Sequence, residues 1–234
     1  SNLYVNPNPV TFLVMNETEH DWWWTEVQKL STTMEQSWWG GMHCNPNMYS
    51  HCGYGTSPNA DGSFSFGQII GSAFKWNNSD YAITTHEAIH VYQLGLMGNR
   101  MNALPTWFAE GQANYLGFAF SHKYYNSLTQ RTGSVRGLIS TFPEIRSYSK
   151  SEWAIWLKKI DSDYEYTFNN SLGYSVGELL LENIYNTFGY QKVHKWLVEI
   201  KNGANYKDGF VTTFGTNYDQ WLTEVAAEYL DSQV

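Results

Sequence analysis

Two short segments constrain this chain more than anything else in it: His86-Glu87-Ala88-Ile89-His90, and a glutamate, Glu110, that follows His90 after nineteen intervening residues. Positions i and i+4 of a helix lie one turn apart on one face, so the imidazoles of His86 and His90 can point at one centre. Glu87 neighbours that centre, and Glu110 is the natural third ligand. Two histidines and one carboxylate that leave a fourth position to water are typical of a catalytic zinc site. The pattern predicts a single Zn²⁺ held by His86, His90 and Glu110.

The local sequence favours rigid helices around these residues. Residues 80–97 have apolar side chains at helical spacing, which predicts a partly buried helix that carries both histidines. Pro105 suits the first turn of a second helix, over about 105–119, with Glu110 near its middle. Asn114 is one turn after Glu110 and is a candidate to orient a metal ligand, although a packing or surface role for it is an equal alternative.

At these residues the chain resembles the gluzincin zinc metallopeptidases, most of all the catalytic domain of the aminopeptidase N-like branch. Residues 104–113 look like the second zinc helix of that branch, and Gly173-Tyr174-Ser175-Val176-Gly177 looks like its Tyr-x-x-Gly segment. The resemblance covers roughly residues 65–230. The spacing between His90 and Glu110 equals that of the thermolysin type and is one residue longer than in aminopeptidase N. The Gly-x-Met-Glu-Asn segment, which reads a free amino terminus in that branch, is missing.

The chemistry expected from these residues is hydrolysis by a metal-activated water. Glu87, a carboxylate beside the metal but not bound to it, is expected to act as the general base. The resemblance implies that Tyr174 supports the oxyanion of the tetrahedral intermediate. His122 and His194 are the alternative donors, and for both a surface position on a helix is the simpler reading.

The expected fold class is α+β and zincin-like, in one catalytic unit over residues 1–234. An N-terminal α/β lobe, 1–98, would include the zinc helix, and a mainly helical lobe, 99–234, would face it across the metal. We expect strands at Val10–Met15 and Phe64–Phe74 and a loop over residues 40–62. We expect helices at about 20–37, 143–160, 172–187, 190–201, 206–214 and 217–231.

A polypeptide substrate needs a surface that holds its backbone. In gluzincins the strand before the zinc helix is a sheet edge, so residues 67–74 are the candidate, by β-augmentation. The residues named for this role are Gly67, Gln68, Ile69, Ile70 and Gly71; an ordinary internal strand is an equal alternative.

The missing amino-terminus reader bears on where the enzyme cuts. A buried ammonium needs a paired carboxylate, and the segment after Gly62 up to residue 79 has no acid. We therefore expect an endopeptidase, unless a distant acid such as Glu144 or Asp163 fills that role in an aminopeptidase. The same residues also allow a catalytically silent peptidase-fold binding module, or a zinc hydrolase of a non-peptide bond.

The two cysteines indicate a compartment. Cys44 and Cys52 bracket a short polar loop, which predicts a local disulfide and a secreted, periplasmic or extracellular protein. A second metal site with the adjacent His43 and His51 is the alternative. The chain begins with Ser1 rather than Met, so we expect a mature fragment or an added residue at the start.

The bulk composition excludes several classes of partner. The net charge is -8 and no Lys/Arg cluster occurs, which argues against nucleic acid. No apolar run approaches the roughly 18–20 residues of a membrane span. Alternating acids at Asp161-Ser162-Asp163-Tyr164-Glu165 suggest calcium only weakly, because the glycine and length of a calcium loop are missing. The sequence does not indicate an oligomeric state.

Overall fold

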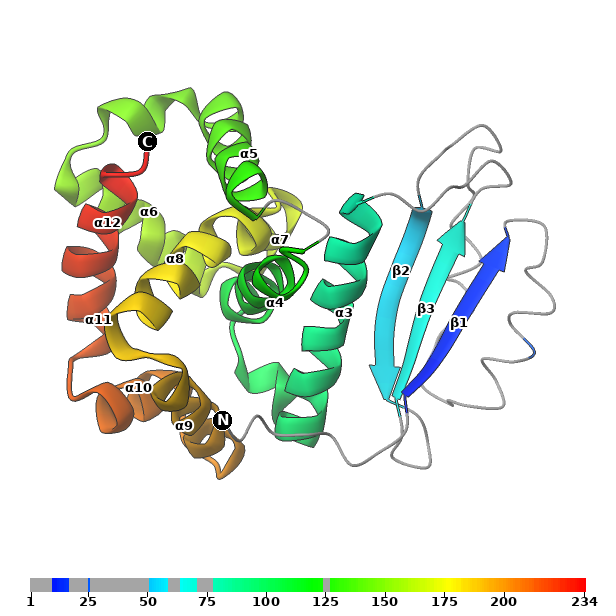
Figure 1. Cartoon of the computed structure of the whole chain (residues 1–234). Helices are drawn as coiled ribbons and strands as arrows, with labels where there is room; N and C mark the ends of the chain where they lie inside the picture. The colour runs from blue at the N-terminus through cyan, green and yellow to red at the C-terminus, as the bar shows by residue number, and fades with distance from the viewer. Residues whose placement is uncertain (1–9, 17–24, 26–50, 59–63, 71–77, 124–126) are drawn as a thin grey trace.

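The computed structural model of the chain describes residues 10–16, 25, 51–58, 64–70, 78–123 and 127–234. Within the strands, and for residues 78–80 and 127, it describes the backbone alone. Helices make up most of the described chain, and a layer of strands lies beside the helix α3 (Figure 1).

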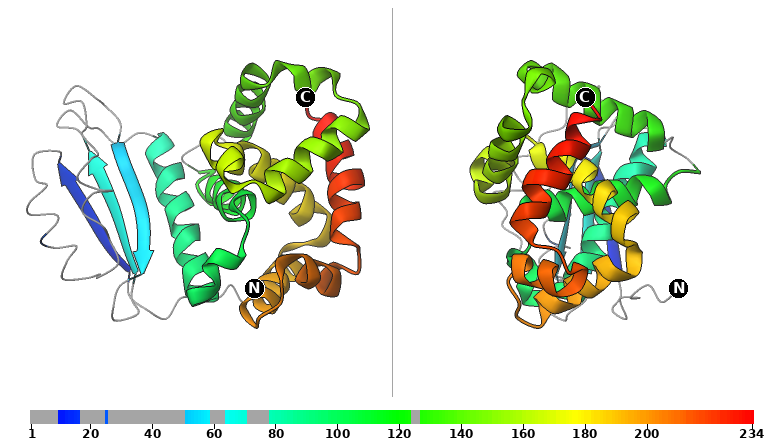
Figure 2. Two further views of the ribbon diagram at one scale, coloured as in Figure 1. Left: turned by 180° about the vertical axis from the view of Figure 1, so that it is seen from behind. Right: turned by 90° about the vertical axis from the view of Figure 1, so that its left-hand side faces the viewer.

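Three strands form one small sheet with the order β1-β3-β2. β3 (Phe64–Ile70) is central: it pairs parallel with β1 (Val10–Asn16) and antiparallel with β2 (His51–Pro58). β2 is the edge strand next to α3, and β1 is the edge away from it (Figures 1 and 2). β2 falls inside the segment that the sequence predicted to be a loop. The predicted helix over about 20–37 lies outside the described residues, apart from Thr25.

The helical part runs from α3 to the end of the chain. α3 carries the two histidines and α4 carries Glu110. The helices, with the short 3₁₀ helices η1 and η2 and the π-helical segment η3, are α3 (Asn78–Met97), η1 (Gly98–Ala103), α4 (Thr106–Phe120), α5 (Ser127–Thr141), η2 (Pro143–Ser147), α6 (Lys150–Ser162), α7 (Tyr164–Asn169), α8 (Leu172–Phe188), α9 (Tyr190–Lys201), α10 (Tyr206–Phe214), α11 (Tyr218–Gln220), η3 (Trp221–Ala226) and α12 (Ala227–Asp231).

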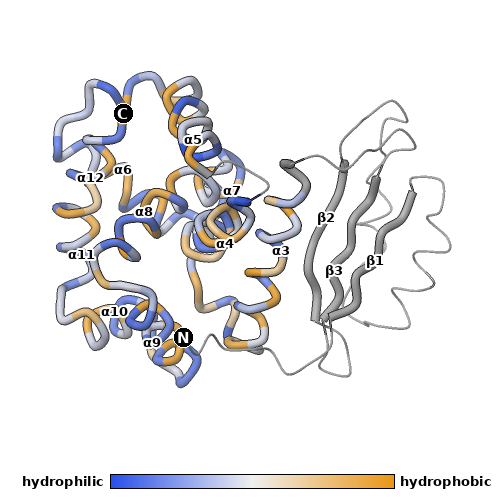
Figure 3. Tube along the Cα trace, in the orientation of Figure 1, coloured by the Kyte–Doolittle hydropathy of each residue, from blue (hydrophilic) through white to orange (hydrophobic). Residues whose placement is uncertain are grey.

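The predicted fold class, α+β with a small mixed sheet opposite a helical lobe, is wrong: the fold is mainly helical. The buried cluster that forms the described core extends from Ile89 to Leu230, and its members come from the helices and the turns between them. No residue with a described side chain lies in a strand. Along the helices apolar and polar segments alternate, as expected of helices that bury one face (Figure 3).

A buried carboxylate ties the helices behind α4 together. The side chain of Asp161 in α6 is 4% exposed. Its oxygens accept hydrogen bonds from Trp107 Nε1 at 3.0 Å, Tyr218 Oη at 2.6 Å and Tyr206 Oη at 3.0 Å, and Lys207 Nζ lies 3.1 Å away. A buried charge satisfied by this many donors fixes α4, α6, α10 and α11 relative to one another. Because Trp107 precedes Glu110 by three residues in α4, the network also holds the helix that carries this third candidate ligand.

Candidate metal centre

His86, His90 and Glu110 come together between α3 and α4. One ligand atom from each residue lies within 4.8 Å of the other two. Among the described residues, these three form the group of His, Cys, Asp or Glu side chains that could hold a metal ion. The Nε2 atoms of the two histidines are 3.0 Å apart. Glu110 Oε2 lies 3.4 Å from each of them. His86 is buried, and the other two are half-buried.

The tautomer of the His86 ring is set by the hydrogen bond of its Nδ1 atom. Asn114 Nδ2 donates to the carbonyl of Tyr174 at 3.2 Å, which turns Asn114 Oδ1 toward His86. His86 Nδ1 lies 2.7 Å from that oxygen and must donate to it, because an amide oxygen can only accept. In the neutral ring the lone pair is then on Nε2, the atom that faces His90 and Glu110.

The same logic applies to His90 through a longer chain of amides. Gln93 Nε2 donates to Ala109 O and to Gln112 Oε1, both at 2.9 Å, so Gln93 Oε1 faces His90. His90 Nδ1 lies 2.7 Å from Gln93 Oε1 and donates to it. Gln112 Nε2 in turn donates to Tyr185 Oη at 2.7 Å, which fixes the orientation of the Gln112 amide.

These constraints leave three electron-pair donors that face one another. The two Nε2 atoms have lone pairs in the neutral rings, and Glu110 Oε2 is a buried oxygen with no hydrogen-bond partner in the described part of the chain. Such a set is mutually repulsive unless a cation or a proton lies between its members. The donors therefore fit a metal ion, and two imidazoles with one carboxylate are a set that Zn²⁺ accepts.

The pKa values of His90 and Glu110 also indicate that a positive charge among the three side chains is favourable. Burial lowers the pKa of His90, but the Glu110 carboxylate close to its ring, with smaller contributions from Glu87 and Gln93, raises it to about 9. Burial raises the pKa of Glu110, yet its interactions with His86 and His90 lower it to about 2. A group with these two shifts favours a positive charge among its members, which a bound cation or a proton supplies.

Glu87 and Tyr174 lie beside this group without belonging to it. Glu87 is buried in α3, and its charge contributes to the raised pKa of His90, so its carboxylate is close to the ligands. The Tyr174 ring stacks on the His86 ring, with centroids 5.9 Å apart and planes inclined at 21°. Tyr174 is partly exposed, at 36%. Both residues are thus placed where a substrate at the metal could meet them.

Two close helix crossings hold the ligands in position. A Cβ added to Gly111, next to Glu110, would overlap the backbone of Gly177 in α8, and one added to Gly177 would overlap the Trp107 carbonyl. On the other side of α4, a Cβ at Gly117 would lie 2.7 Å from the backbone nitrogen of His86. Backbones this close tolerate only glycine. The two glycines at the α4–α8 crossing belong to the segments that carry the resemblance to gluzincins, and here both serve helix packing.

The other acids and histidines named from the sequence lie elsewhere. His194 Nδ1 is 2.8 Å from Tyr92 Oη, and His122 is exposed just after α4. Asp163 caps α7 by accepting from Tyr166 N, while Asp161 accepts from the helices described above. Asp161 and Asp163 thus bind different partners, and they do not form a calcium site together. Glu144 is exposed in η2.

The predicted substrate strand needs a correction. β3 is bonded on both sides, so Gly67, Gln68, Ile69 and Ile70 pair with β1 and β2 and do not form an edge that can accept a further chain. Gly71 lies outside the described residues. The arrangement is the internal strand that the sequence left open as an alternative.

The predicted disulfide stays a prediction. Cys44 lies outside the described residues, and Cys52 lies in β2, where the backbone alone is described. The location in an oxidising compartment, which depends on this pair, stays a prediction with it.

Sequence reasoning missed the residues that orient His90. Gln93 is three residues after His90 on the same helix face, so a polar partner within reach was visible in the sequence. Gln112 and Tyr185, which complete the chain of hydrogen bonds, come from two other helices and could not be assigned without the fold. Both Gln93 and Gln112 are 0% exposed, which shows that the network is part of the interior.

Comparisons of this chain with protein-family models, with curated proteins and with solved structures found no match. No helix among the described residues combines the length and apolar composition needed to cross a membrane.

Proposed function

We propose that this protein is a zinc-dependent hydrolase of peptide bonds that cuts within polypeptide chains. The observation that supports the metal is the convergence of His86 Nε2, His90 Nε2 and Glu110 Oε2, three electron-pair donors whose hydrogen-bonded surroundings leave them facing one another. The ligand spacing and the position of Glu87 support hydrolysis. The resemblance to gluzincins supports a peptide substrate.

The three ligands would hold the ion between α3, which carries the two histidines, and α4, which carries Glu110. When bound, zinc would lower the pKa of a coordinated water and polarise the carbonyl that is attacked. The chain holds both histidines rigidly. His86 donates to the Asn114 amide, which donates to the Tyr174 carbonyl. His90 donates to the Gln93 amide, which donates to Gln112. Such supporting bonds keep ligand atoms in place through turnover.

Glu87 is the general base of the proposed reaction. It follows His86 directly in α3, is 4% exposed and is not among the three ligands. A carboxylate in this position can accept a proton from the attacking water and pass it to the leaving amine. Burial favours this transfer because it strengthens the interaction between the charge of Glu87 and the reacting groups.

Tyr174 is the proposed donor to the substrate's oxygen. Its ring lies against His86, and its own carbonyl is held by Asn114, so the position of the phenol is coupled to that of a ligand. A phenol that donates to the oxygen on which negative charge develops stabilises the transition state more than the bound substrate.

Internal cleavage is supported by the positions of the acids considered for an amino-terminal reader. Asp163 is engaged as a helix cap and Glu144 is on the surface of η2. Neither is among the described residues that surround the metal ligands.

The test combines metal analysis with digestion. The purified protein should contain close to one zinc per chain, and it should cut casein into internal fragments that mass spectrometry identifies. A chelator should abolish both the metal and the cleavage, and added zinc should restore them. His90→Ala should lose metal and activity together, whereas His122→Ala, which changes an exposed histidine outside the group, should lose neither.

Two outcomes would overturn the proposal. Full zinc occupancy in His90→Ala would remove His90 from the ligand set. Zinc-loaded protein that leaves casein and short peptides intact would favour the silent binding module or the hydrolase of another bond.

A further inference from the structure

A second buried carboxylate lies near the candidate metal centre, and the proposed reaction does not use it. Glu178 is in α8, one turn after Tyr174, and is 4% exposed. Ser134 Oγ from α5 donates to Glu178 Oε2 at 2.9 Å and is the one hydrogen-bond donor to this carboxylate in the described part of the chain. A buried carboxylate with a single neutral donor is poorly compensated.

The neighbouring acid is compensated by its own partners. Glu182 accepts from Arg131 Nε at 2.9 and 2.7 Å through its two oxygens, and from Tyr229 Oη at 2.7 Å. Arg131 also donates to Gln233. The positive charge of Arg131 is therefore committed to Glu182, and the negative charge of Glu178 is left without a paired cation among the described residues.

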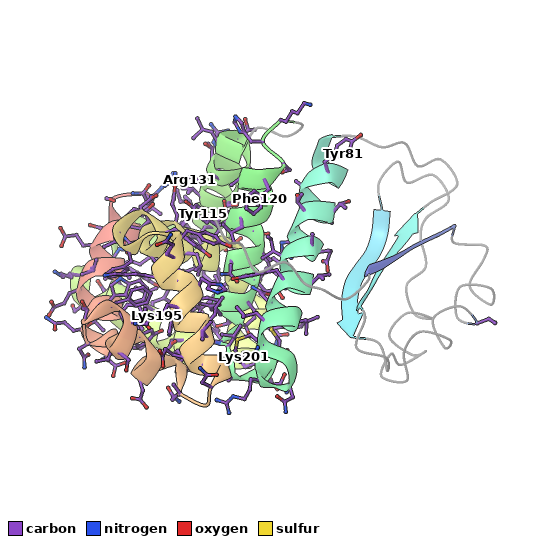
Figure 4. All side chains as sticks on the ribbon, turned by 60° about the horizontal axis from the view of Figure 1, so that its bottom comes forward. Tyr81, Tyr115, Phe120, Arg131, Lys195 and Lys201 are labelled. Atoms are coloured by element: carbon purple, nitrogen blue, oxygen red, sulfur yellow. The ribbon has the colours of Figure 1, made fainter. Side chains whose placement is uncertain are left out.

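Glu178 lines a pocket of about 270 Å³ between α4, α5 and α8. Tyr115 and Phe118 from α4 and Leu128 from α5 form its apolar wall, and Arg131 and Glu182 form the rest of its charged side. Tyr115 in α4 and Arg131 in α5 line the same pocket, and their labels lie close together in Figure 4. The pocket thus combines one carboxylate that lacks a counter-charge with aromatic and aliphatic surface.

We propose that this pocket binds a primary ammonium group on an alkyl chain, with Glu178 as its counter-charge. The carboxylate would accept a charge-assisted hydrogen bond from the ammonium, and Tyr115 and Phe118 would contact the alkyl chain and present ring faces to the cation. A neutral group of the same shape would leave Glu178 with Ser134 as its one hydrogen-bond donor among the described residues.

The pKa of Glu178 agrees with the poor compensation of its charge. Burial raises the pKa of this carboxyl to about 7, with a further rise from Glu182 that Ser134 and Arg131 oppose. A bound ammonium would favour the charged form and lower this pKa again.

The pocket is one helical turn from the ring that lies against His86. Tyr174 and Glu178 occupy positions i and i+4 of α8, so they share a face of that helix. Assigning the ammonium to a substrate rests on the proposed function, because it would then be a lysine side chain of the polypeptide that is cut internally. Binding of an alkylammonium by the pocket does not depend on that function.

Three matched probes test the site by calorimetry or ligand-observed NMR on the intact protein. Nα-acetyl-lysine amide has a side-chain ammonium, norleucine amide has only an α-ammonium, and Nα-acetyl-norleucine amide has neither. At least one ammonium probe should bind about tenfold or more tightly than the probe without an ammonium, the factor expected for a buried charge-assisted hydrogen bond. The two ammonium probes distinguish a lysine side chain from an amino terminus. Equal binding of all three probes by the wild-type protein would overturn the proposal, whatever any variant does.

The variant that tests the residue is Glu178→Gln, which keeps the shape of the side chain and still accepts from Ser134. It should reduce the preference for the ammonium probe to about twofold or less, because the charge that favours the cation is gone. Glu144→Gln, which changes an exposed acid in η2, should keep the full preference. An unchanged preference in a folded Glu178→Gln protein would exclude Glu178 as the counter-charge and sink the proposal.

Cleavage assays separate this inference from the proposed function. Wild-type protein that binds the ammonium probes but cuts no peptide would leave the pocket standing and overturn the peptidase. Protein that cuts lysine-containing and norleucine-containing peptides equally, and binds all three probes equally, would keep the peptidase and overturn the pocket.

Discussion

His86 and Asn114 are joined across the α3–α4 interface by a 2.7 Å hydrogen bond from Nδ1 to Oδ1. The bond connects a candidate metal ligand on α3 to α4, the helix that carries the candidate ligand Glu110, four residues before Asn114. Because Asn114 also donates to the Tyr174 carbonyl, one amide fixes the tautomer of a ligand and holds the proposed oxyanion donor. The supporting bonds are therefore as much a part of the candidate site as the ligands.

Removing that amide should weaken metal binding without emptying the site. Asn114→Ala leaves His86 Nδ1 without its acceptor, so we expect zinc affinity to fall by about 10–100-fold. Asn114→Asp, which keeps an acceptor for Nδ1, should retain affinity within a few-fold. Competition with a fluorescent chelator measures both, and equal affinities in the alanine and aspartate variants would show that the bond does not support the ligand.

Glu87→Gln should separate metal binding from turnover. The side chain is not a ligand, so zinc content should stay near one per chain, while the loss of a positioned base should lower kcat by at least about 10²-fold. Peptide hydrolysis by metal-loaded variant and wild type gives the comparison. Near-normal turnover would assign the proton transfer to another group.

Tyr174→Phe should affect the transition state more than the bound substrate. We expect kcat to fall by about 10²–10³-fold with KM little changed, because the phenol would bond to an oxygen that becomes charged during the reaction. Tyr164→Phe, at an exposed tyrosine in α7, is the matched control and should have wild-type kinetics. A change in KM alone would make Tyr174 a substrate contact.

Local sequence signals placed the three candidate metal ligands and most of the helices. The i, i+4 histidine pair and the glutamate in a helix opened by Pro105 are local patterns, and residues 86, 90 and 110 do converge in space. The helices after residue 170 lie close to their predicted ranges, because glycines such as Gly189 and Gly215 interrupt long apolar patterns there. α5 was not predicted, since its polar sequence with two glycines is a weak helix signal.

Non-local relationships were beyond the sequence. The order β1-β3-β2 depends on a pairing between segments about fifty residues apart, which no local pattern specifies, so the expectation of a sheet edge at β3 is wrong. The expected fold class is wrong because β-type runs before residue 75 suggest a mixed lobe, whereas the described core is helical. No sequence pattern singles out Glu178, because only the fold brings Ser134 and Tyr115 to it.

The crossing of α4 and α8 should tolerate no side chain at Gly111. Gly111→Ala would push a methyl group into the Gly177 backbone, so we expect a loss of about 3 kcal/mol or more in the free energy of unfolding, with lower zinc affinity as α4 shifts. Gly133→Ala is the control: this exposed helical glycine in α5 has nothing within 4 Å of an added Cβ and should gain about 0.5–1 kcal/mol. Urea denaturation decides, and a neutral Gly111→Ala would contradict the close crossing.

The buried carboxyl of Glu178 should make the stability of the fold depend on pH. Its pKa rises from 4.5 to about 7 in the folded chain, where Ser134, Arg131, Glu182 and Tyr115 surround it. The folded state therefore binds this proton more tightly than the unfolded state does. The stabilisation is complete below about pH 4.5, declines as the pH rises, and is lost above about pH 7.

Glu178→Gln removes this titration, so the free energy of unfolding of the variant should depend less on pH. Between pH 5 and 8 the wild-type free energy of unfolding should fall relative to that of the variant, by a total on the order of 3 kcal/mol. The titrations of His90 and Glu110 occur in both proteins and cancel in the difference. Urea denaturation at half-unit pH steps measures it, with Glu165→Gln, at an exposed acid of α7, as the control that should follow the wild type. Parallel curves for wild type and Glu178→Gln would show that the carboxyl titrates alike in the folded and unfolded chain, and that its burial is compensated by groups other than those named.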